Sequence, residues 1–124
     1  MNILKCKLVA CTAFIFIAAA FSNGVFAAWL NVTGKVTSIN TYASRETVLV
    51  NLDNAGAEVA ECSNKTTFAI SKGISAEARA RMYSLLLAAQ SANRKVRIAF
   101  NDVGSCESWD AATSVYRKIQ RVNN

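Results

Sequence analysis

The stretch from Ser75 to Phe100 reads SAEARARMYSLLLAAQSANRKVRIAF, and it predicts a helix followed at once by a strand. Ser75 is a favoured N-cap residue, and Glu77 lies in the first turn, where the helix dipole favours an acid. Apolar residues then recur at spacings of three and four, which is typical of an amphipathic helix. The segment Lys95 to Phe100 alternates instead with a period of two, as a half-buried strand does. The expected buried stripe of the helix consists of Ala78, Met82, Leu85, Leu86 and Ala89.

Three strands are expected before this helix. The segment from Asn31 to Tyr42 is rich in β-branched residues and favours a long strand with a kink or bulge at Gly34. Thr47 to Leu52 alternates and is followed by turn residues. Ala60–Cys62 and Thr66–Ile70 together predict a third, interrupted strand, whose ends the pattern does not define sharply.

After the helix, the strand Lys95–Phe100 is followed by a polar segment from Asn101 to Ala112, which we expect to be a loop. Val115–Val122 predicts a last strand, although its charged alternate positions also suit a short helix. Three strands, a helix and two strands is the order of the five-stranded oligonucleotide/oligosaccharide-binding (OB) barrel, in which the helix lies between strands three and four. The sequence therefore predicts a β-rich α+β fold, a small OB-fold-like barrel, which by itself does not specify a ligand.

The N-terminal segment has the pattern of a cleavable secretory signal. Lys5 and Lys7 precede an unbroken apolar and small run from Leu8 to Phe21, and a polar break leads to Val25-Phe26-Ala27, where small or branched residues stand at the positions that a signal peptidase reads. We therefore expect residues 1–27 to be a signal peptide cleaved after Ala27, and residues 28–124 to be a single exported domain.

Two other interpretations of this segment are weaker. A membrane anchor needs about 20 apolar residues, and the run from Leu8 to Phe21 is shorter than that. Leu8 to Cys11 resembles a lipobox, but a lipobox ends an apolar stretch, and this one begins it. We expect a secreted or periplasmic protein, without stable membrane insertion of the mature chain, and the short signal led by lysines is typical of bacteria.

Cleavage after Ala27 removes Cys6 and Cys11 and leaves Cys62 and Cys106. A pair of cysteines in a short exported domain predicts one disulfide, because the compartment is oxidising. The alternative, a metal site with two cysteine ligands, is disfavoured because the chain contains no histidine. We expect neither a metal nor a cofactor.

Catalytic residue patterns are sparse. Without histidine, nucleophilic catalysis by a Ser-His-Asp or Cys-His set is excluded. The eight acidic residues form no motif, and most fall in expected turns, where solvated acids are common. The sequence thus favours a binding protein over an enzyme.

Four short segments carry a resemblance to a known family: Thr33-Gly34, Ala60-Glu61-Cys62, Tyr83 within the helix, and Lys95-Val96-Arg97-Ile98. In these features the chain resembles the OB-fold B subunits of the pentameric A–B toxins, of the subtilase cytotoxin type. The resemblance implies a glycan-binding barrel without catalytic activity that assembles into a homo-oligomeric ring.

Barrels of this kind bind a sugar by stacking an aromatic ring on its apolar face and holding its hydroxyls with polar groups. We expect Tyr42, Trp109 and Asp110 to contact the ligand, and the resemblance adds Thr33. Other roles stay open: Trp109 could pack over the disulfide, Tyr42 could be an ordinary aromatic at the rim, and Thr33 could be a strand hydroxyl facing water.

Six basic residues lie on or beside the last two strands, and if these strands pair they form one basic surface. Such a surface is compatible with three roles: a solvated face, a binding site for an acidic glycan, or a binding site for a nucleic acid. Export and the lack of interleaved aromatic residues argue against nucleic acid. We therefore expect an exported protein that binds a glycan or another cell-surface ligand; the alternative is a periplasmic structural or inhibitory protein that binds another protein through the same barrel. The basic residues are Arg94, Lys95, Arg97, Arg117, Lys118 and Arg121.

Overall fold

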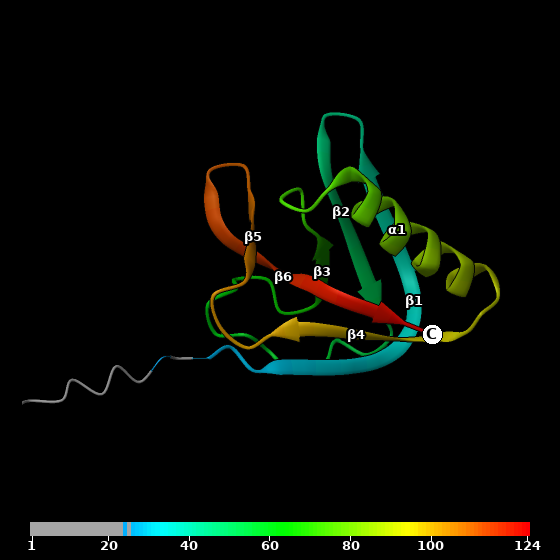
Figure 1. Ribbon diagram of the computed structural model, residues 1–124, viewed down its shortest axis with the longest axis horizontal. Coiled ribbons are helices and arrows are strands. Elements are labelled where there is room, and N and C mark those ends of the chain that lie inside the picture. The colour runs from blue at the N-terminus through cyan, green and yellow to red at the C-terminus, as the bar shows by residue number, and fades with distance from the viewer. Residues whose placement is uncertain (1–23, 25) are drawn as a thin grey trace, which may run out of the picture.

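The computed structural model describes residue 24 and residues 26–124, and Figure 1 shows a strongly curved sheet with one helix against it. Nearly all of the expected signal peptide lies outside the described residues. Within them, no helix is long and apolar enough to cross a membrane. The elements are β1 (Trp29–Tyr42), β2 (Arg45–Leu52), β3 (Thr67–Ile70), α1 (Ala76–Ser91), β4 (Lys95–Asn101), β5 (Cys106–Trp109) and β6 (Ala112–Asn123).

The strands close into a barrel. Their order in the sheet is β3-β2-β1-β4-β6-β5, and a further parallel pairing of Phe68 with Arg117 and of Ala69 with Lys118 joins β3 to β6 and completes the ring. All the other pairings are antiparallel. With α1 between β3 and β4, this is the expected OB-fold-like barrel, so the predicted fold class is confirmed.

The polar segment between β4 and β6 is the main departure from expectation. It was predicted to be a loop, but Cys106–Trp109 forms β5, which pairs with β6 through Glu107 opposite Tyr116 and Trp109 opposite Ala112. The chain reverses at Asp110, whose φ of 51° lies in the left-handed region. The sequence pattern missed this strand because its buried side chain is the carboxylate of Glu107 rather than an apolar group.

The structure also defines the other strands more sharply than the sequence pattern predicted. Only Thr67–Ile70 forms β3, and Ala60–Cys62 lies outside it. The last segment is a strand and not a helix. A kink or bulge was expected at Gly34, but the irregularities in the pairing of β1 with β2 fall further along, between Val36 and Ser38 and between Asn40 and Tyr42. A Cβ at Gly34 would lie 2.5 Å from Oδ1 of Asp53, so this glycine lets the turn after β2 approach β1 closely.

The helix begins as predicted, because the Ser75 hydroxyl accepts the Ala78 N–H at 3.1 Å. Leu86 and Ala89 of the expected stripe are fully buried, and Met82 and Leu85 pack against the same core. The helix packs on β1, β3, β4 and β6 and so covers the interior of the barrel. The core side chains of the strands include Val50, Phe68, Ile70, Ile98 and Phe100.

The expected disulfide is confirmed. Cys62 and Cys106 are joined, with their Cα atoms 5.5 Å apart, and the bond ties the segment before β3 to the start of β5. Because disulfides persist in oxidising environments, the bond indicates an extracytoplasmic compartment.

Candidate ligand-binding site

Two hairpin turns that are far apart in sequence come together at one corner of the barrel. One joins β1 to β2 and the other joins β5 to β6, and Figure 1 shows both hairpins projecting from the same side of the molecule. The rings of Tyr42 and Trp109 meet edge to face, with centroids 5.2 Å apart. The guanidinium of Arg45 lies 4.2 Å from the centre of the Trp109 ring and forms an ion pair with Asp110.

A third ring completes this group. Tyr116 on β6 meets Trp109 edge to face at 5.5 Å. Trp109 thus has tyrosine rings beside it and a guanidinium over one of its faces, which fixes its orientation. Tyr42 is the more accessible ring, with 44% of its surface exposed. We call Tyr42, Arg45, Trp109, Asp110 and Tyr116 the hairpin corner.

A hollow of about 280 Å³ lies beside the hairpin corner. Its lining is polar and contains hydroxyl groups, two cations and one acid. Such side chains can hold the hydroxyl groups or a charged substituent of a ligand. The lining residues are Ser44, Arg45, Glu46, Thr47, Lys72 and Ser108.

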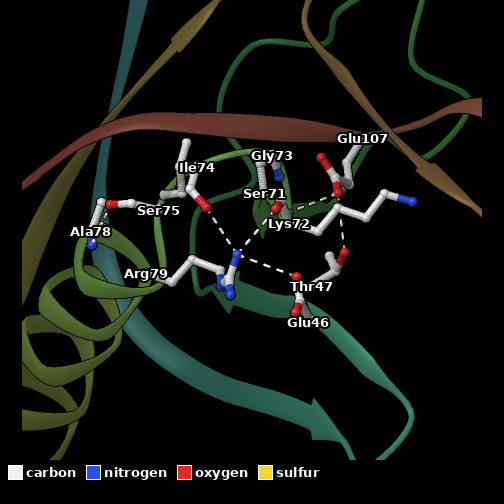
Figure 2. Close-up of polar contacts among 10 residues, drawn as sticks. All are labelled: Glu46, Thr47, Ser71, Lys72, Gly73, Ile74, Ser75, Ala78, Arg79 and Glu107. Atoms are coloured by element: carbon white, nitrogen blue, oxygen red, sulfur yellow. Dashed lines mark hydrogen bonds and ion pairs between the residues drawn. The ribbon is translucent and has the colours of Figure 1, made fainter.

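A buried carboxylate holds the side chains next to this hollow. Glu107 is only 2% exposed, and its Oε1 accepts the Thr47 hydroxyl at 3.0 Å and the backbone N–H of Lys72 at 3.1 Å. Its Oε2 lies 3.9 Å from Nζ of Lys118. Figure 2 shows Glu107 reaching from β5 to β2 and to the loop before α1. One side chain therefore joins three segments of the wall.

The loop between β3 and α1 is held from its other side by Arg79. The Nη1 group of Arg79 donates to the carbonyl oxygens of Lys72 and Ile74 and lies 3.5 Å from Oε2 of Glu46 (Figure 2). The backbone of Lys72 is thus fixed by Glu107 at its N–H and by Arg79 at its C=O. The hollow is therefore formed before any ligand arrives.

The predicted site residues divide into two places. Tyr42, Trp109 and Asp110 come together in the hairpin corner, whereas Thr33 lies on β1 opposite Arg97 of β4, on an exposed outer face. The prediction did not include Arg45, Lys72, Glu107 and Tyr116. Only Arg45 could have been suggested by its position in the sequence, because it stands in the polar turn after Tyr42.

The expected basic surface is also divided. Arg117 points inward: it is 1% exposed, its guanidinium lies 3.9 Å from the Phe68 ring centre, and its Nη1 donates to the carbonyls of Ala55 and Ala57. Burial lowers the pKa of Arg117 to about 10, while the nearby charge of Glu58 acts in the opposite direction. Arg117 therefore belongs to the core and not to the basic surface.

No family model, curated protein or solved structure matches the chain.

Proposed function

We propose that this protein is an exported, non-catalytic binding protein whose hairpin corner and adjoining hollow hold a glycan. OB barrels bind oligosaccharides and oligonucleotides through the loops between their first and second and their fourth and fifth strands. Here those loops are the β1–β2 turn and the β4–β6 connection that contains β5, and they are the two segments that meet in the hairpin corner.

The observation that carries the proposal is the exposed ring of Tyr42, supported by Trp109 and placed beside a polar hollow. A sugar ring stacks its apolar C–H face on an aromatic side chain and needs hydrogen-bonding groups at its edge. Arg45 already covers one face of Trp109, so Tyr42 is the better platform. Ser44 and Ser108 then lie where hydroxyl groups of the sugar would be held.

The resemblance to toxin B subunits extends this proposal to assembly. A homo-oligomeric ring would place several hairpin corners on one particle, and multivalency would raise the avidity of a weak glycan site. A sedimentation mass equal to one chain at micromolar concentration would contradict the ring without affecting the glycan site.

A glycan array on the disulfide-bonded protein tests the main proposal. We expect selective binding that Tyr42→Ala or Trp109→Ala reduces by about tenfold or more, in line with the loss of an aromatic anchor. Arg81→Gln is the control, because Arg81 is exposed on α1 and lies outside the hairpin corner.

Two outcomes count against the glycan site. An array without selective binding, together with a protein partner whose binding needs Tyr42, would favour the structural or inhibitory alternative. Selective binding that Thr33→Ala abolishes, and that Tyr42→Ala leaves intact, would place the glycan elsewhere on the barrel.

A further inference from the structure

A second surface lies on the outer face of the sheet formed by β1, β4 and β6. Along β1 the inward residues Val32, Gly34 and Val36 are buried, so the alternate positions Trp29, Asn31, Thr33 and Lys35 point outward. Residues directly opposite in an antiparallel pair share a face. The strand register therefore shows which side chains of β4 and β6 join them.

The register places four cations on this face. Lys35 is opposite Lys95, and Thr33 is opposite Arg97. On the other side of β4, Ala99 is opposite Arg121. We call Lys35, Lys95, Arg97 and Arg121 the cationic face.

These cations have no acidic partners in the described part of the chain. None of the ion pairs found there within 4.0 Å involves any of the four. Two carboxylates bond to the backbone at the ends of the outward row on β1: Asp53 accepts the Lys35 N–H, and Asp102 accepts the Ala28 N–H. The side chains between these ends carry only positive charge or none.

The arrangement costs stability in the free protein. Lys35 and Lys95 stand directly opposite each other, and like charges at such positions repel. An anion bound between the two ammonium groups would turn that repulsion into attraction. This pair of lysines therefore favours the binding of an anionic ligand and does not favour the stability of the fold.

An exposed aromatic ring completes the surface. Trp29 is 53% exposed, and the guanidinium of Arg121 lies 5.2 Å from its ring centre. The outward row from Trp29 to Lys35 extends about 20 Å at the usual rise of a strand. A row of this length fits an extended chain with repeating anions, and the indole gives a sugar ring a stacking surface.

We propose that the cationic face binds a linear acidic polysaccharide that carries sulfate or phosphate groups. The surface is separate from the hairpin corner, so this inference goes beyond the proposed function and does not depend on it. The disulfide indicates an extracytoplasmic compartment, where such polymers occur and where nucleic acid is the less suitable partner.

Isothermal titration calorimetry with sulfated heparin-derived oligosaccharides tests the proposal on the disulfide-bonded protein. We expect binding that weakens as salt rises, because a polyanion releases counterions when it is bound. Arg97→Gln should weaken the affinity about threefold, as expected for one exposed ion pair, and should lower the salt slope by about one. Replacing all four cations by Gln should leave no measurable binding.

The control is Arg81→Gln, which removes one exposed positive charge from α1, outside the cationic face, and should leave the affinity unchanged. Trp109→Ala should also leave it unchanged, which separates this site from the hairpin corner. Equal loss in Arg81→Gln and Arg97→Gln would overturn the proposal, since it would show attraction by net charge alone. Tighter binding to phosphatidylglycerol vesicles or to single-stranded DNA than to the sulfated oligosaccharide would also overturn it.

Discussion

Arg45, directly after the first hairpin turn, forms an ion pair with Asp110 in the last one. The two residues are 65 positions apart in sequence, and the same guanidinium lies over the ring of Trp109. One side chain thereby joins both hairpins to the aromatic group between them. We therefore expect this contact to matter more for the geometry of the hairpin corner than for the stability of the barrel.

Replacing Asp110 by Asn tests that distinction. Asn tolerates the left-handed backbone of residue 110 as well as Asp does, so the substitution removes the charge without adding strain. Because both partners are partly exposed, we expect the free energy of unfolding to fall by less than about 1 kcal/mol. Glycan binding should weaken about threefold, since Arg45 keeps a hydrogen-bond acceptor at residue 110 but loses the ionic attraction that fixes it. Urea denaturation and titration with the array-selected glycan measure the two effects, and unchanged binding would contradict this role of the pair.

The disulfide should contribute much of the stability. It joins Cys62 and Cys106 across a separation of 44 residues, for which loop-closure entropy gives about 4 kcal/mol. We expect the double variant Cys62→Ala/Cys106→Ala to lose about that much in urea denaturation. A reducing agent should destabilise the native protein and leave the double variant unaffected. Equal midpoints for the oxidised and reduced native protein would contradict the prediction.

The regular elements could be predicted from local pattern. The Ser75 cap, the helical stripe and the alternation in Lys95–Phe100 are each visible within a few residues, and each is confirmed. The strand β5 could not be predicted in this way, because pattern analysis assumes that inward positions are apolar. Here the inward position is Glu107, which is acceptable only because Thr47 and Lys72, distant in sequence, supply its donors.

The candidate site could also be predicted only in part from local sequence pattern. Tyr42, Trp109 and Asp110 were predicted because barrels of this kind hold a sugar with an aromatic ring and nearby polar groups. That Tyr42 meets Trp109 and Asp110 depends on the pairing of β1 with β4 and of β4 with β6, which joins distant parts of the sequence and which no local signal contains. Thr33 was assigned from the resemblance, and the topology places it on a different face from the other three.

Glu107 should be important for both folding and the hollow. In Glu107→Ala the Thr47 hydroxyl and the Lys72 N–H lose their acceptor, and we expect a loss of about 3 kcal/mol in the free energy of unfolding. Glu107→Gln keeps an oxygen in the same place and loses only the attraction to Lys118, so its loss should be smaller. Chemical denaturation of the two variants gives the comparison. If Gln were as destabilising as Ala, the charge rather than the hydrogen bonds would be the main contribution.

Arg117 offers a test of a buried charge. Its guanidinium lies over Phe68 and within 5.3 Å of the Phe100 ring centre, and it donates to two loop carbonyls. Arg117→Ala should cost about 3 to 5 kcal/mol, because it leaves a cavity between the rings and frees both carbonyls. Arg117→Met fills most of that volume but frees the same two carbonyls, so it should cost about 1 to 3 kcal/mol, less than Arg117→Ala. Equal losses in the two variants would show that the hydrogen bonds matter more than the packing.

The pH dependence of the same comparison has a definite sign. Burial lowers the pKa of Arg117 in the folded protein from the ordinary value of a guanidinium to about 10. Above pH 10 the unfolded chain therefore binds more protons at this residue than the folded one, so the contribution of Arg117 to stability rises with pH. Below that range both states are charged, and its contribution is constant. The quantity to measure is the free energy of unfolding of the native protein minus that of Arg117→Met, obtained by urea denaturation at pH 7 and at pH 10.5. The titration of the lysines and tyrosines that both proteins share cancels in this difference. We expect this difference to shift in favour of the native protein at the higher pH; a constant difference, or a shift toward the Met variant, would contradict a charged arginine held in the core.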